Sequence, residues 1–99
     1  MNLKKLKKIK LELNEMRRSP FNRKPSELSS IAKQLGRTID NRGKEPTYVR
    51  AREPALSPPL SIPKHPGDLK PGTARNIIEA LLSDVDDWEI HLMEKDDEY

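Results

Sequence analysis

Apolar side chains recur at helical spacing in three separate stretches of this sequence, residues 2–17, 25–36 and 73–92. Between the second and third stretches lie only short strand patterns, around Ile39, over Thr47–Arg52 and over Leu60–Ile62. Each helical stripe has to be covered by another element, and a small antiparallel sheet with both later helices on one face does this economically. The sequence therefore predicts an α+β chain, ordered α-β-β-β-α from residue 25, with an extra N-terminal amphipathic helix.

The expected helix ends follow from particular residues. Pro25 suits the first position of a helix, where a missing N–H loses no hydrogen bond, and Gly36 suits a left-handed cap after the last turn. Thr73 is the expected N-cap of the last helix. That helix is expected to end near Leu92, before an acidic C-terminal tail that frays. Asn41-Arg42-Gly43 is typical of a turn between strands.

Alternation in the segment Thr47–Arg52 predicts a half-buried strand. Thr47 and Val49 are expected on its inner side, with Tyr48 and Arg50 on a basic outer face. An outward Tyr48 would be free to stack on a nucleotide. On the last helix, Trp88 is expected in the core, whereas His91, among acidic residues, is expected to be solvated.

Charge is divided unevenly along the chain. Residues 1–73 hold 17 Lys and Arg against 7 Asp and Glu, whereas residues 74–99 hold 2 against 9. A basic body of this kind favours a polyanionic partner. There is no cysteine, no transmembrane run, and no His, Cys or acidic spacing typical of a metal site, so no metal or cofactor and no membrane partner is expected. The lysine-rich N-terminus lacks the apolar run of a signal peptide and favours a cytoplasmic protein.

The N-terminal helix leaves three interpretations open. A helix this short is only marginally stable in isolation, so its apolar stripe, formed by Leu6, Ile9, Leu13 and Met16, needs a cover. It can pack on its own domain, pair with another chain as in a homodimer through this helix, or lie on an anionic surface. Packing within the protein or within a dimer is the favoured interpretation.

One segment resembles a known family. LSIPKHPGDLKPGTARNIIEALL, residues 60–82, is similar to the end of HicA-type toxins, which are small bacterial mRNA interferases of the YcfA family. Upstream, SELSSIAKQLG is similar to the first helix of the family and NRGKEPTYV to the start of its central hairpin. The residues that carry the resemblance in the last part are Pro63, Lys64, His65, Leu69, Lys70, Pro71, Gly72, Thr73, Arg75, Ile77 and Ile78.

The resemblance implies a fold like that of a double-stranded-RNA-binding domain and a toxin of a type II toxin–antitoxin system. Such a toxin binds and cleaves mRNA without a metal, and a HicB-like antitoxin is its usual protein partner. The HicA-like domain is expected over residues 26–92. The basic N-terminal helix over residues 1–18, the linker over 19–25 and the acidic tail over 93–99 are additions to the minimal family.

The chain departs from the family where the catalytic histidine is expected. That histidine follows a glycine–serine pair, and aligning Gly43 with the glycine places Glu45 or Pro46 at the histidine. Metal-free RNA cleavage needs a base for the 2′-hydroxyl, an acid for the leaving oxygen and positive charge on the phosphate. Glu45, as a weak base, and His65 are therefore the candidate catalytic residues. The candidate RNA-binding residues are Arg42, Lys44, Tyr48, Arg50, Lys64 and Lys70.

Two alternatives to a working ribonuclease follow from the same residues. Glu45 in place of the histidine is also compatible with a non-catalytic RNA-binding or regulatory module of the same fold. A third interpretation is a protein-interaction module, in which the N-terminal stripe pairs with a partner and the charges are solvated.

Overall fold

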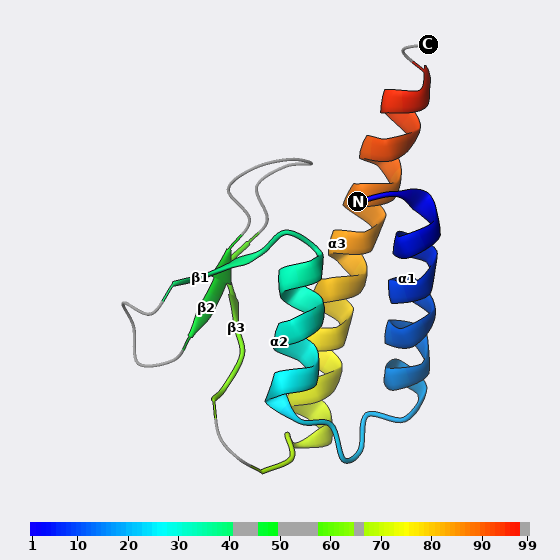
Figure 1. Ribbon diagram of the computed structural model, residues 1–99. Helices are drawn as coiled ribbons and strands as arrows, with labels where there is room; N and C mark the ends of the chain where they lie inside the picture. The colour runs from blue at the N-terminus through cyan, green and yellow to red at the C-terminus, as the bar shows by residue number, and fades with distance from the viewer. Residues whose placement is uncertain (41–45, 50–57, 65–66, 98–99) are drawn as a thin grey trace.

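The computed structural model describes residues 1–40, 46–49, 58–64 and 67–97 of the chain (Figure 1). In this part of the chain the order of elements is the one that the sequence predicts, with one helix before an α-β-β-β-α unit. The elements are α1 Leu3–Arg18, α2 Pro25–Gln34, β1 Thr38–Asp40, β2 Thr47–Val49, β3 Leu60–Ser61 and α3 Pro71–Asp97. The predicted turn at 41–43 and the second half of the predicted strand over 47–52 lie outside the described residues.

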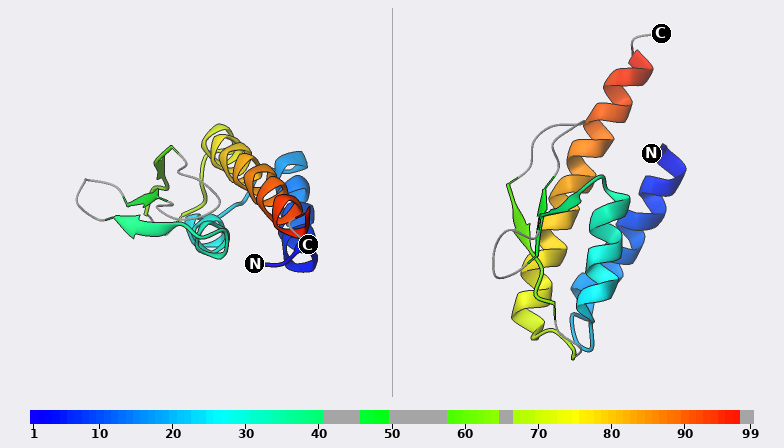
Figure 2. Two further views of the ribbon diagram at one scale, coloured as in Figure 1. Left: turned by 90° about the horizontal axis from the view of Figure 1, so that it is seen from above. Right: turned by 60° about the vertical axis from the view of Figure 1, so that its left-hand side comes forward.

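The elements form three layers (Figure 2). The strands pair antiparallel in the order β1-β2-β3, with Ile39 opposite Tyr48 and Tyr48 opposite Leu60. Helices α2 and α3 lie on one face of this sheet, as predicted, and α1 packs along α3 on the side away from the sheet. Helix α3 is therefore the support shared by the sheet and by α1.

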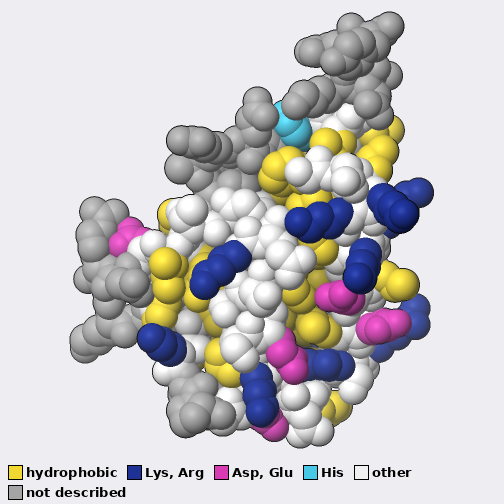
Figure 3. Space-filling view, viewed as in Figure 1, with side chains coloured by type: hydrophobic (Ala, Val, Ile, Leu, Met, Phe, Trp, Pro, Cys, Tyr) yellow, Lys and Arg dark blue, Asp and Glu magenta, His cyan; other side chains and the backbone are white. Residues whose placement is uncertain are grey.

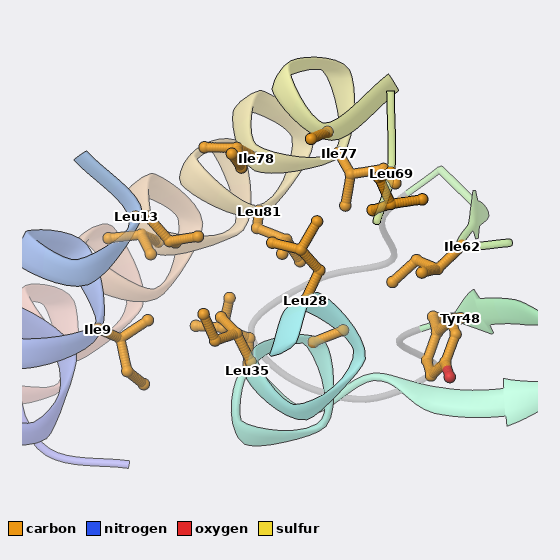
Figure 4. Close-up of a cluster of buried hydrophobic side chains, with 14 of the residues drawn as sticks. Ile9, Leu13, Leu28, Leu35, Tyr48, Ile62, Leu69, Ile77, Ile78 and Leu81 are labelled. Atoms are coloured by element: carbon orange, nitrogen blue, oxygen red, sulfur yellow. The ribbon is translucent and has the colours of Figure 1, made fainter. Parts of the chain in front are cut away.

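The core runs through all three layers (Figure 4). Tyr48 and Ile62 point from the sheet side toward the helices, and the stripe of α1 closes the opposite end. This stripe is covered within the chain, so packing on its own domain, the first of the three interpretations, is confirmed for its buried residues. The largest fully buried apolar side chains of the helices and of the cap after α2 are Leu6, Leu13, Leu28, Leu35, Ile78, Leu81 and Val85.

Helix α2 ends at a glycine, as predicted. Gly36 has a φ of 92°, a left-handed conformation that a side chain would strain. Its N–H donates to the carbonyl of Lys33 at 3.0 Å, and the N–H of Arg37 donates to the carbonyl of Ala32 at 3.0 Å. These two bonds form a Schellman cap, which satisfies the last carbonyls of the helix and turns the chain so that Arg37 enters the interior.

Arg37 and Asp84 form a buried ion pair between the end of α2 and the middle of α3. The guanidinium Nε and Nη2 of Arg37 donate to the two carboxylate oxygens of Asp84 at 2.6 and 2.8 Å. Its Nη1 donates to the carbonyls of Tyr48 at 2.7 Å and Pro58 at 3.1 Å. Both side chains are 2% exposed. One cation thus ties α2, β2, the segment before β3 and α3 together.

Helix α3 is longer than predicted at both ends. It begins at Pro71, with the N–H of Ala74 donating to the carbonyl of Lys70 at 2.9 Å, so the predicted N-cap at Thr73 is wrong. Pro71 suits the first helical position for the same reason as Pro25. The helix continues to Asp97 rather than ending near Leu92. Met, Glu and Lys after Leu92 are good helix formers, so most of the predicted acidic tail belongs to α3.

We expect each member of the buried ion pair to need the other. Arg37→Met or Asp84→Leu alone leaves a charge buried without its counterion, which lowers the free energy of unfolding by about 3–5 kcal/mol. The double variant removes both charges, so its loss is expected to be smaller than the sum of the single losses by about 2–3 kcal/mol. Urea unfolding followed by circular dichroism measures all four chains. Additive losses would contradict a coupled pair.

Candidate nucleic-acid interface

A cleft of about 430 Å³ lies between α2 and the sheet. Its rim carries the exposed lysines Lys24, Lys33 and Lys64, which come from the start of α2, the end of α2 and the segment after β3. Within the described residues, no Asp or Glu lines the cleft. Figure 3 shows Lys and Arg side chains over this part of the molecule with apolar atoms between them. The cleft is therefore a cationic site with room for part of an anionic chain.

Helix α2 contributes one polar face and its N-terminus to the cleft. Ser26, Ser29 and Lys33 are spaced three and four residues apart, so they lie on the same face and line the cleft. Lys24 is the N-cap and makes no side-chain cap hydrogen bond. The positive end of the helix dipole thus lies at the cleft and adds to the lysine charges. Sequence reasoning overlooked this face because it concentrated on the hairpin and on the loop before the last helix.

The base of the cleft is apolar. Tyr48 and Ile62 are buried there, and Ile39, directly opposite Tyr48 in the sheet, is partly exposed beside them. An apolar floor below three lysines suits a ligand that has negatively charged groups attached to a less polar ring system. A sugar–phosphate unit with its base fits this description, and the volume lies in the range of small-ligand sites, about 300–1,000 Å³.

Only some of the predicted site residues lie at the cleft. Lys64 lines the cleft, whereas Lys70 is exposed just before α3 and does not line it. The remaining predicted positions, Arg42, Lys44, Glu45, Arg50 and His65, lie outside the described residues. Pro46 and Lys64, the chain neighbours of Glu45 and His65, both line the cleft.

The predicted orientation of β2 is wrong. Tyr48 is 5% exposed and faces the helices, whereas Thr47 and Val49 are half-buried on the other side. Alternation determines which residues share a face but not which face turns inward. The aromatic ring buries more apolar area than Thr47 and Val49 offer, and so it takes the inner side. In this position the ring is part of the core and not an outward platform for stacking a nucleotide.

Two aromatic residues of α3 help to hold the helix layer together. Trp88 packs on the core, as predicted, and its indole Nε1 donates to the carbonyl of Leu35 at 2.8 Å. His91 is half-buried rather than solvated, which corrects the prediction: its ring stands edge-on to Trp88, with 5.8 Å between ring centroids.

Other kinds of site are not apparent in the described ranges. No three or more His, Cys, Asp or Glu residues are placed there to hold a metal ion, and no helix there is both long and apolar enough to cross a membrane. Comparison with protein-family models, curated proteins and solved structures finds no significant match.

The buried position of Tyr48 predicts a stability defect on truncation. Tyr48→Ala removes a buried ring from the core and is expected to lower the free energy of unfolding by about 3 kcal/mol. Tyr48→Phe keeps the ring and is expected to lose less than about 1 kcal/mol. Chemical unfolding of the two variants distinguishes them. Full stability of Tyr48→Ala would show that the ring is not a core residue.

Proposed function

We propose that this chain is a HicA-like toxin of a type II toxin–antitoxin system, which binds mRNA in the cleft between α2 and the sheet and cleaves it without a metal. The observation that carries the proposal is the convergence of Lys24, Lys33 and Lys64 on one cleft, beside the N-terminus of α2. The sequence resemblance over residues 25–82 and the α-β-β-β-α order support it. The fold resembling a double-stranded-RNA-binding domain is part of the same proposal.

Phosphate binding is the part of this function that the cleft supports most directly. Lysines contribute to RNA affinity by replacing counterions on phosphates, and no carboxylate among the described lining residues opposes them. The serine hydroxyls of α2 offer hydrogen bonds to phosphate or sugar oxygens. An mRNA is largely single-stranded, so a single strand is the ligand proposed for the cleft.

Cleavage requires proton transfer in addition to phosphate binding. The lysines of the rim would stabilise the charge that builds on the phosphate in the transition state. In this proposal Glu45 takes the proton of the 2′-hydroxyl as the 2′-oxygen bonds to phosphorus. Protonated His65 donates its own proton to the 5′-oxygen as the bond from that oxygen to phosphorus breaks, because these types of side chain act as base and acid. A HicB-like antitoxin would inhibit the toxin by covering the same cleft.

A second candidate function keeps RNA binding without cleavage. It is favoured by Glu45 at the position of the family histidine, since a carboxylate with an ordinary pKa near 4 is a weak base. The third interpretation, a protein-interaction module, is weaker now that the stripe of α1 is covered by α3.

Removing the rim charges is expected to weaken RNA binding. The triple variant Lys24→Gln/Lys33→Gln/Lys64→Gln should bind a single-stranded RNA of about 5 nucleotides at least tenfold more weakly than the wild type at about 50 mM salt, because three phosphate contacts are lost. The slope of log affinity against log salt should fall by about 2. Fluorescence anisotropy measures both quantities.

The matched control is Lys4→Gln/Lys7→Gln/Lys8→Gln on α1, which removes the same charge away from the cleft. Its affinity for this short RNA is expected to match the wild type. If both triple variants lose the same amount of RNA affinity, the effect comes from net charge alone. That result would contradict binding in the cleft.

Cleavage is tested with the purified chain in the presence and absence of EDTA, beside a Glu45→His variant. We expect the wild type to cleave mRNA, EDTA to have no effect, and Glu45→His to cleave faster because histidine is the better base near neutral pH. Cleavage by the histidine variant alone would establish the second candidate function. Cleavage by neither, with RNA still bound, would contradict the proposed nuclease activity.

A further inference from the structure

The first two turns of α1 carry an unbalanced positive surface. Four lysines there are exposed, and within the described part of the chain none of them forms an ion pair. No Asp or Glu occurs between Met1 and Leu11, and none stands in the first turn of the helix. These four residues, called here the α1 lysine face, are Lys4, Lys5, Lys7 and Lys8.

The α1 lysine face works against the stability of its own helix. Lys4 and Lys8 are four residues apart, and like charges at this spacing repel. The face also lies at the positive end of the helix dipole, where carboxylates rather than lysines are favourable. Burial of the apolar stripe against α3 holds α1 in place despite these terms. The charges of these lysines therefore do not stabilise the fold, which points to a role outside it.

Lys10, the next lysine along α1, differs from the α1 lysine face because it forms an ion pair. Nζ of Lys10 lies 2.8 Å from Oε1 of Glu89 on α3. The hydrogen bond and the charge of Glu89 raise the pKa of Lys10 above its ordinary value. Its contribution to stability is therefore complete at neutral pH and is lost only as the pH rises through this raised pKa. The lysine beside α3 is thus neutralised by the fold, and the α1 lysine face is not.

The arrangement of α1 favours a nucleic-acid backbone over a membrane. A helix that lies on a bilayer inserts its apolar stripe, but Leu6, Ile9 and Leu13 are at most 3% exposed against the rest of the chain. The exposed Leu3 and Leu11 of α1 are separated by Lys7 and do not form a second stripe. A phosphate backbone needs only charges at the surface. Figure 3 shows Lys and Arg side chains over both α1 and α2 on one face of the molecule, with some Asp and Glu side chains among them.

We propose that the α1 lysine face is a second RNA-contact surface, which holds the backbone of the same strand whose phosphates occupy the cleft. This inference rests on the proposed function and extends it: the cleft alone suffices for a short RNA, and the α1 lysine face adds affinity only when the strand is long enough to reach both. Contacts of this kind to phosphates are independent of sequence.

The test compares two RNA lengths in three proteins. One single-stranded RNA has about 5 nucleotides, and the other about 25, which exceeds the 47 Å length of the molecule when extended. The proteins are the wild type, Lys4→Gln/Lys5→Gln/Lys7→Gln/Lys8→Gln, and the triple variant of the cleft lysines. Anisotropy titrations over a range of salt concentrations give the affinity and the salt slope for each pair.

We expect the α1 variant to bind the long RNA at least tenfold more weakly than the wild type near 50 mM salt, with a salt slope smaller by about 2–3. It should bind the short RNA as the wild type does. Its melting temperature should be equal to that of the wild type or higher, because repulsion is relieved. When the melting temperature is not lowered, a loss of RNA affinity cannot be attributed to unfolding.

The two proposals fail in different ways. Unchanged affinity of the α1 variant for the long RNA, together with weak binding by the cleft variant, overturns this inference and leaves the proposed function standing. Unchanged affinity of the cleft variant for the short RNA overturns the proposed function instead. A wild-type dimer in light scattering that the α1 substitutions dissociate, with RNA affinity unchanged, would make a second copy of the chain the partner of the α1 lysine face and overturn the inference.

Discussion

The guanidinium of Arg37 is removed from water at the point where α2, the sheet and α3 meet. Burying a charge in this way is unfavourable unless every part of it is compensated. Here the carboxylate of Asp84 binds it through two bonds, and the carbonyls of Tyr48 and Pro58 accept two more. A bidentate arginine–carboxylate pair has a strict geometry. Because the same guanidinium also binds the carbonyl of Tyr48, the pair holds the sheet at one position against α3. The cleft depends on it, because one of its walls is α2 and the other is the sheet.

The local elements could be read from the sequence, whereas the contacts between them could not. Helical spacing, Pro25 and Gly36 each act within a few residues, and the helices and the cap after α2 were predicted from them. Arg37 and Asp84 are 47 residues apart, and a buried arginine looks like a surface arginine in the sequence. The predicted orientation of Tyr48 was wrong for a related reason, because alternation contains no information about which side of a strand the helices will cover.

The candidate site was predicted only in part. The sequence pointed to Lys64 through the family resemblance, but the polar face of α2 was overlooked because Ser26, Ser29 and Lys33 look like an ordinary solvent-facing side of an amphipathic helix. Only the packing of α2 beside the sheet turns this face into the wall of a cleft. Glu45 and His65 lie outside the described residues, and their catalytic roles stay predictions.

Helix α3 separates the lysines of the cleft from the α1 lysine face. On one side, with α2, it supports the sheet and the cleft. On the other side it covers the stripe of α1 and leaves the α1 lysine face exposed. Pairing of Lys10 with Glu89 shows that the fold neutralises a lysine where α1 meets α3. The lysines that remain unpaired in the described structure, at the rim of the cleft and on α1, are the basis of the functional proposals.

Binding of RNA in the cleft can be tested by locating the contact on the folded chain. Amide NMR spectra recorded while a short single-stranded RNA is added would do this. Binding in the cleft predicts that the amides of Ser26, Ser29 and Lys64 shift first, while those of α1 are unchanged. Shifts confined to other surfaces, or no shifts at concentrations that saturate binding, would contradict it.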